Sequence, residues 1–159
     1  MQTEPSLASG RLSETLIDKT FPADFRWVRR TMQETVDILS GDAAIAVEDV
    51  ETIEIILAEA LNNVVEHAYP EDAKGDVTLV IRRRRGSLMC EIKDHGRPMP
   101  NGKVPNGDHP MSREDGDAMP EGGYGWFLIR ELVRDLIYDR KDGENVLFMT
   151  FATQGRPGP

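Results

Sequence analysis

The chain has a single cysteine, Cys90, among its 159 residues. One thiol excludes an internal disulfide, and with it the small disulfide-stabilised folds of secreted proteins. No run of 18 apolar residues occurs in the sequence, so we expect no membrane-spanning helix. Residues 1–10 (MQTEPSLASG) lack the basic start and the apolar stretch of a signal peptide. These absences predict a cytoplasmic protein.

Basic residues are also in short supply. Lysine and arginine number 19 against 28 aspartates and glutamates, which gives a net charge of −9 and a pI near 4.8. This surplus of acid argues against general binding to nucleic acids or to anionic membranes. The arginine run 82–85 is divided between two faces by the alternation of a predicted strand. We interpret it as a solvated strand end or a docking spot for an acidic partner.

The composition that remains is that of one globular domain. The chain is 39% hydrophobic and 30% charged, and it is long enough to bury a core without disulfides or a structural metal. We expect a single domain over residues 11–153, with frayed tails at 1–10 and 154–159.

Apolar periodicity predicts the order of the elements. We expect an edge strand over 11–20, a helix capped by Asp24 and ended by 40–42, a helix over 47–68 stopped by Pro70, and a hairpin of 77–81 with 88–92. A last helix opens at 122–125, with a core stripe of Ile129, Leu132, Val133 and Leu136, and strands near 136–141 and 145–153 follow. This order predicts an α+β fold, a two-layer α/β sandwich with helices on one face of a mixed, mostly antiparallel sheet.

The helix over 47–68 carries an unusual polar pair. Glu59 and Asn63 are four residues apart and therefore share a face beside the apolar stripe. A carboxylate can take a proton from a nucleophile, and an amide oxygen is a suitable ligand for Mg²⁺. A charge on an exposed helix face is the ordinary explanation of Glu59, but asparagine is disfavoured inside helices.

Two further clusters follow. Asp94 ends a predicted strand, where its carboxylate could accept a hydrogen bond from an exocyclic amine, and Gly96 would let a flat base approach the backbone. Gly122, Gly123 and Gly125 open the last helix, where free N–H groups favour phosphate oxygens. Residues 95–121 between them have no sustained apolar period, and a loop of this length is usually functional. Taken alone, Asp94 could equally be a solvated turn residue.

The order and spacing of these clusters resemble the GHKL ATPase superfamily, which has the Bergerat ATP-binding fold. Residues 59–69 resemble its N box, Asp94-x-Gly96-x-Pro98 its G1 box, and Gly123-x-Gly125 its G2 box. Within the superfamily, the chain is most similar to the RsbW-type anti-sigma factor serine/threonine protein kinases. The resemblance extends from about residue 20 to residue 151.

The resemblance implies a role for each motif. Glu59 would be the general base, and Asn63 would hold Mg²⁺ on the nucleotide phosphates. Asp94 would bind the adenine amine of ATP, with Gly96 beneath the base and Pro98 beside it. Gly122, Gly123 and Gly125 would cradle the phosphates. Residues 95–121 would form the ATP lid.

The resemblance also implies a function, and alternatives stay open. The first is a kinase of a partner-switching module, which sequesters a sigma factor and phosphorylates a serine or threonine of a STAS-domain antagonist. The second is an ATP-gated binding protein with little phosphate transfer. The partners would be proteins, with no direct contact to nucleic acid or membrane, and a homodimer is possible. Retention of both Glu59 and Asn63 favours the kinase, since a pure binder has no need of a base.

Overall fold

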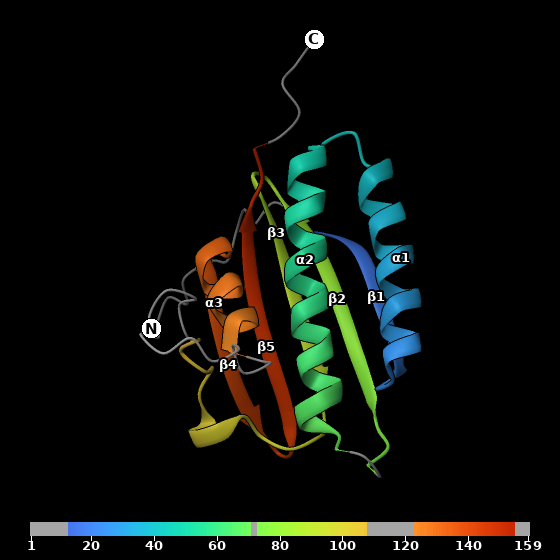
Figure 1. Ribbon diagram of the computed structural model, residues 1–159. Helices are drawn as coiled ribbons and strands as arrows, with labels where there is room; N and C mark the ends of the chain where they lie inside the picture. Colours follow the sequence, from blue (N-terminus) through green and yellow to red (C-terminus); the bar gives the residue numbers. More distant parts are fainter. Residues whose placement is uncertain (1–12, 71–72, 108–122, 155–159) are drawn as a thin grey trace, which may run out of the picture.

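The described part of the chain forms one five-stranded sheet with three α-helices on a single face (Figure 1). The computed structural model describes residues 13–70, 73–107 and 123–154. The strands follow the order β1-β2-β3-β5-β4, and each neighbouring pair is antiparallel. The elements are β1 (Glu14–Pro22), α1 (Phe25–Gly41), α2 (Val47–Asn63), β2 (Asp76–Arg84), β3 (Ser87–Asp94), α3 (Gly123–Leu132), β4 (Asp135–Lys141) and β5 (Glu144–Ala152). The predicted α+β two-layer sandwich is confirmed, but the described strands form a purely antiparallel sheet and not a mixed one, because every pair of neighbours runs in opposite directions.

Helix α1 begins and packs as its sequence predicts. Asp24 caps it, because the side chain of Asp24 accepts a hydrogen bond from the amide of Arg26 at 2.7 Å. Its buried residues recur at helical spacing. They are Val28, Thr31, Met32, Thr35 and Leu39.

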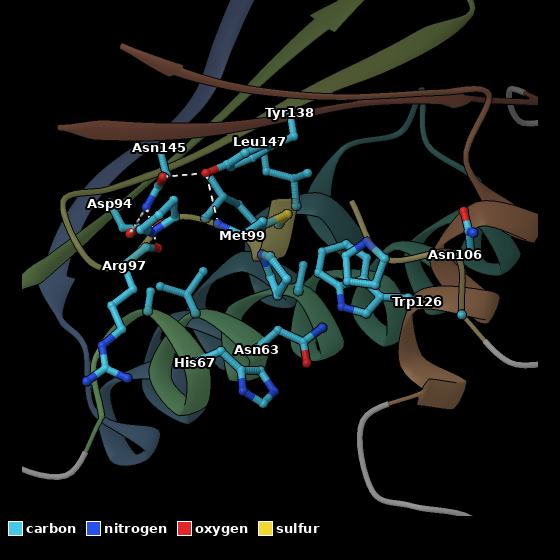
Figure 2. Close-up of a pocket in the computed structure, with 18 residues that line it drawn as sticks. Asn63, His67, Asp94, Arg97, Met99, Asn106, Trp126, Tyr138, Asn145 and Leu147 are labelled. Carbon is cyan, nitrogen blue, oxygen red and sulfur yellow. Dashed lines mark hydrogen bonds between the residues drawn. The ribbon is translucent and has the colours of Figure 1, made fainter. Parts of the chain in front are cut away.

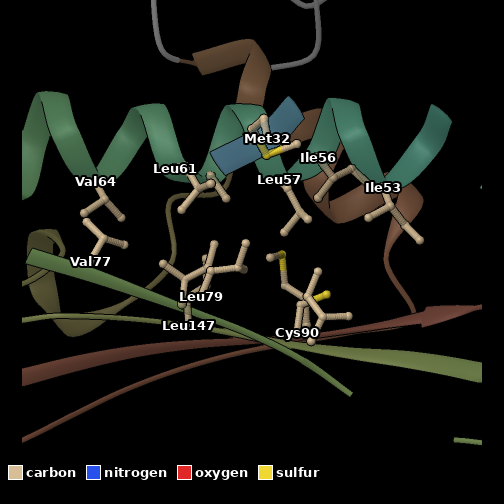
Figure 3. Close-up of a cluster of buried hydrophobic side chains, with 14 of the residues drawn as sticks. Met32, Ile53, Ile56, Leu57, Leu61, Val64, Val77, Leu79, Cys90 and Leu147 are labelled. Atoms are coloured by element: carbon tan, nitrogen blue, oxygen red, sulfur yellow. The ribbon is translucent and has the colours of Figure 1, made fainter. Parts of the chain in front are cut away.

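Helix α2 lies across the middle of the sheet and contributes more buried core residues than any other element. Figure 3 shows Ile53, Leu57 and Leu61 above the sheet, facing side chains such as Leu79, Cys90 and Leu147. The sequence predicts one helix to residue 68, but the α-helical geometry does not extend that far. It ends at Asn63 and continues as a π-helical turn, Val64–Ala68. The carbonyl of Ala68 accepts the amide of Arg97 at 2.9 Å, so the chain at this end is also held from the loop after β3.

The sheet hairpins follow their turn residues. Gly86, with φ of 75°, turns β2 into β3, and Asp142 and Gly143 join β4 to β5 with φ of 51° and 80°. The predicted alternation in β3 is confirmed, because Leu88, Cys90 and Ile92 are all buried. Burial raises the pKa of the Cys90 thiol far above its usual value, which makes it an unreactive part of the core.

The predicted core stripe of the last helix is partly wrong. Ile129 is fully buried, but Leu132 is 44% exposed and Leu136 lies in β4. Helix α3 ends at Leu132, and the amide of Arg134 already bonds to the carbonyl of Thr150 on β5. The helical period therefore stops one turn earlier than the apolar pattern suggests.

The predicted tails lie almost wholly outside the described residues. Gln154 is the exception, and its amide donates to the Asp49 carboxylate at 3.0 Å. Among the described residues, no helix combines the length and the apolar character needed to cross a membrane.

Candidate functional site

A cavity of about 660 Å³ lies between the end of α2, the loop after β3 and helix α3. Its size is in the range of small-molecule binding sites. Three residues predicted from the sequence line it, namely Asn63, Asp94 and Pro98. Figure 2 shows the cavity with Asp94 and Asn145 near one end and Trp126 and Asn106 near the other. Residues far apart in the sequence therefore meet in one cavity.

Asp94 is a buried carboxylate in a fixed orientation. It is 5% exposed, and its Oδ1 accepts hydrogen bonds from the amide of Gly96 at 2.9 Å and from Nδ2 of Asn145 at 2.8 Å. The position follows from register, because Asp94 pairs with Asn145 across β3 and β5. Both bonds go to one oxygen, and they hold the carboxylate at the cavity wall.

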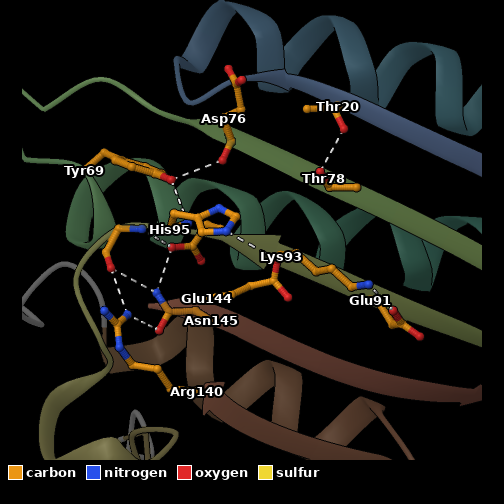
Figure 4. Close-up of polar contacts among 12 residues, drawn as sticks. Thr20, Tyr69, Asp76, Thr78, Glu91, Lys93, His95, Arg140, Glu144 and Asn145 are labelled. Atoms are coloured by element: carbon orange, nitrogen blue, oxygen red, sulfur yellow. Dashed lines mark hydrogen bonds and ion pairs between the residues drawn. The ribbon is translucent and has the colours of Figure 1, made fainter. Parts of the chain in front are cut away.

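Asn145 is the centre of the polar network at this end (Figure 4). Its Nδ2 also donates to the carbonyl of Arg97 at 3.0 Å, and its Oδ1 accepts from the Tyr138 hydroxyl at 2.6 Å and from Nη1 of Arg140 at 2.7 Å. Reversing the amide would set its oxygen against a carboxylate and a carbonyl, so the network fixes its orientation. Sequence reasoning did not assign Asn145 to the site. An asparagine within a predicted strand was the available signal.

Tyr138 and Arg140 fix the loop after β3 to the edge of the sheet. The Tyr138 hydroxyl accepts the amide of Met99 at 3.1 Å, and Arg140 donates to the carbonyl of Gly96 at 2.9 Å. Neither residue was singled out from the sequence. Together they hold one wall of the cavity on β4 and β5.

Asn63 presents an unsatisfied amide. The residue is 8% exposed and lines the cavity, and its Nδ2 is buried without a hydrogen-bond partner (Figure 2). An unpaired buried donor costs on the order of 1–3 kcal/mol, so it points to a missing partner such as a ligand or a water. Thr31 Oγ1 on α1 is also buried without a partner, but among these two residues only Asn63 lines the cavity.

Glu59 lies one turn before Asn63 on α2 but does not line the cavity. Its carboxylate faces α3. A Cβ added at Gly125 would lie 2.5 Å from Oε2 of Glu59, so the glycine gives this carboxylate its room beside α3. Gly123 is the first residue of α3, whereas Gly122 lies outside the described residues.

Packing requires a glycine at position 96, which the sequence did not reveal. A Cβ at this position would lie 2.4 Å from the carbonyl oxygen of Ala68. The glycine therefore allows the loop after β3 to touch the π-helical end of α2. It is not among the residues that line the cavity, and its predicted place beneath a base stays a prediction.

Tyr69 also stabilises the contact between the π-helical end of α2 and the loop after β3. Its hydroxyl accepts the amide of His95 at 2.8 Å and donates to the carbonyl of Asp76 at 3.1 Å (Figure 4). Burial is the main cause that raises the pKa of Tyr69, and the nearby charges of Asp94 and Asp76 act in the same direction. The hydroxyl therefore stays protonated and able to donate.

The chain is similar in sequence and in fold to known proteins. The family model described as "Histidine kinase-like ATPase domain" matches residues 21–151. The serine/threonine-protein kinase BtrW of Bordetella bronchiseptica is 33% identical over 99 residues, which cover 62% of this chain and 68% of BtrW. The serine-protein kinase RsbW of Bacillus cereus is 28% identical over 137 residues, 85% of this chain and 84% of that protein.

A solved structure shares the fold. The crystal structure of the RsbU and RsbW domains of a Mycobacterium tuberculosis protein matches with a TM-score of 0.60 at 16% identity. The match covers 89% of this chain but only 34% of the solved chain. At this identity, the likeness concerns the fold alone.

Proposed function

Because this chain belongs to the histidine kinase-like ATPase domain family, we propose that it is an ATP-dependent protein serine/threonine kinase of a partner-switching module. The observation that carries the proposal is a single cavity that joins the buried carboxylate of Asp94 to the unpartnered amide of Asn63. The Asp94 carboxylate can accept a hydrogen bond from the amine of a base. The Asn63 amide can bond to the phosphate end of the same ligand. The relatives BtrW and RsbW are named as protein kinases, which supports the same reaction here.

We propose that Asp94 binds adenine. Its Oδ1 is occupied by Gly96 and Asn145, so its second oxygen would accept the exocyclic amine. A carboxylate cannot donate to the carbonyl that guanine carries at this position, which would select adenine. Pro98 and Leu147 line the same end and would contact the base through apolar surface.

The phosphates would lie toward Asn63 and the start of α3. The amides of Gly123 and Gly125 would bond phosphate oxygens at the positive end of that helix, and the predicted Gly122 would extend this cradle. The described residues contain no group of three or more histidines, cysteines or acids fit to hold a metal. The amide oxygen of Asn63 would be a protein ligand for Mg²⁺ that arrives bound to the nucleotide. When bound, Mg²⁺ would neutralise charge on the transferred phosphate.

Glu59 would act as the general base. Its carboxylate lies one turn from Asn63 and faces the helix of the proposed phosphate cradle. It would take the proton of a serine or threonine hydroxyl as the hydroxyl oxygen bonds to the γ-phosphorus. The bond between that phosphorus and the bridging oxygen breaks, and ADP leaves. Most of the rate would come from positioning the two reactants.

The proposed partners are proteins. From the family resemblance, they are a sigma factor that this chain sequesters and a STAS-domain antagonist that it phosphorylates. A homodimer stays a prediction. The second candidate, an ATP-gated binding protein with little transfer, is favoured by one observation: Glu59 is not among the residues that line the cavity.

Phosphate transfer to a STAS protein tests the proposal. Purified protein with Mg²⁺ and γ-labelled ATP should label a serine or threonine of its cognate STAS protein. Glu59→Ala should abolish labelling but still bind ATP in calorimetry. Glu66→Ala is the matched control, because Glu66 is an exposed glutamate in the adjoining π-helical turn.

Three outcomes separate the candidates. Labelling by the Glu59→Ala variant at the wild-type rate would refute the base. ATP binding without labelling by the wild type would select the binding protein. Asp94→Asn should weaken ATP binding about 10-fold or more, the value of a hydrogen bond to a charged group; unchanged affinity would remove Asp94 from the adenine site.

A further inference from the structure

A short backbone segment forms the wall of the cavity opposite Asp94. Pro105, Asn106 and Gly107 line the cavity there, together with Trp126 of α3. The segment has no regular secondary structure of its own. Its position must therefore come from contacts with neighbouring elements.

Arg130 supplies the main contact. Its Nε donates to the carbonyl of Pro105 and its Nη2 donates to the carbonyl of Val104, both at 2.9 Å. Arg130 lies in the last turn of α3, one turn after Trp126. One planar guanidinium thus grips two consecutive carbonyls, a geometry that lysine cannot reproduce.

Gly107 supplies a second contact with the same helix. A Cβ at Gly107 would lie 2.4 Å from the amide nitrogen of Phe127, and its φ of 69° favours glycine. The segment therefore rests directly on the backbone of α3. Both contacts join the wall to α3, and neither joins it to the sheet.

We propose that Arg130 is a positioning residue that locks the 104–107 wall to α3, so that the wall and the proposed phosphate cradle are held in one arrangement. The inference rests on the proposed nucleotide site. Arg130 does not line the cavity and would act only through the wall. Its loss should affect ligands that reach the phosphate end and spare a ligand confined to the Asp94 end.

Tryptophan fluorescence provides the measurement. The chain has two tryptophans, Trp126 in the cavity wall and Trp27 on α1. Trp27→Phe leaves Trp126 as the single reporter. In that background, ATP, ADP and adenosine are titrated into the parent protein and into the Arg130→Met and Arg130→Lys variants. The matched control is Arg84→Met, an exposed arginine at the end of β2 that pairs with Ser87, away from Asp94.

Arg130→Met should weaken ATP and ADP binding about 10-fold, which corresponds to the loss of one charge-assisted hydrogen bond. Adenosine carries no phosphate and stays at the Asp94 end, so its affinity should change by less than about twofold, which is under about 0.5 kcal/mol. Arg130→Lys should recover less than half of the loss on a logarithmic scale, and Arg84→Met should match the parent.

Equal loss for adenosine and ATP would overturn the inference, because it would mean general damage to the site. Unchanged ATP affinity in Arg130→Met, or full rescue by lysine, would overturn it too. If Arg130→Met fails to fold, the lysine variant still decides the question. Failure of the parent protein to bind ATP would instead refute the proposed function.

Discussion

Replacing Gly96 with alanine tests the junction between the π-helical end of α2 and the loop after β3. The added Cβ would lie 2.4 Å from the backbone oxygen of Ala68, which cannot rotate away as a flexible side chain would. The two backbone segments must separate, and the bond from the amide of Arg97 to the Ala68 carbonyl, 2.9 Å in the native chain, would weaken or break.

The expected loss of stability follows from three contributions. Overpacking costs about 1–3 kcal/mol, and a lost hydrogen bond costs about 0.5–1.5 kcal/mol. Alanine restricts the unfolded chain and returns about 0.4–1 kcal/mol. We expect a net loss of about 2 kcal/mol, equal to a fall in Tm of about 4–8 °C for a domain of this size.

Thermal and urea unfolding without nucleotide measure the effect. Gly41→Ala is the control, because a Cβ there meets no atom within 4 Å and the residue ends α1. It should leave Tm equal or raise it. A Gly96→Ala protein as stable as the wild type would refute the packing argument. Loss of ATP affinity alone, with stability intact, would instead support the sequence prediction that Gly96 lies beneath the base.

Two further predictions concern a part-buried hydrogen bond and a buried thiol. Tyr138→Phe should lower the free energy of unfolding by about 0.5–1.5 kcal/mol, since it removes the hydrogen bond from the amide of Met99; urea unfolding should show no comparable loss for Thr20→Val, whose hydroxyl is exposed. Cys90 has a raised pKa, so the thiolate that reacts with iodoacetamide should be absent from the native protein at about pH 8 and form on unfolding. Rapid alkylation of the native protein at that pH would contradict this burial.

The sequence predicted most of what depends on local periodicity. The Asp24 cap and the hairpin strand over 88–92 are confirmed, because each depends on residues close together in the sequence. The π-helical turn could not be predicted, since the contact between Ala68 and Arg97 joins distant segments. The exposure of Leu132 was missed for a similar reason, because pairing of the following chain with β5 ends α3 early.

The candidate site divides in the same way. Asn63 and Asp94 were identified from motif spacing, and they line one cavity. The network around Asn145 was missed, because its partners come from β3, β4 and the loop between β3 and α3. Arg130 was missed as well, since no local pattern indicates which carbonyls a guanidinium will meet.

Two of the asparagines that line the cavity, Asn63 and Asn145, have opposite capacities for new bonds. Both donors and both acceptor positions of Asn145 are in use, so an incoming molecule could bond to it only by displacing a protein partner. Asn63 has an amide hydrogen donor with no protein acceptor. That nitrogen has almost no solvent-accessible surface, so an acceptor on a ligand would reach it only if the Asn63 side chain turns toward the cavity.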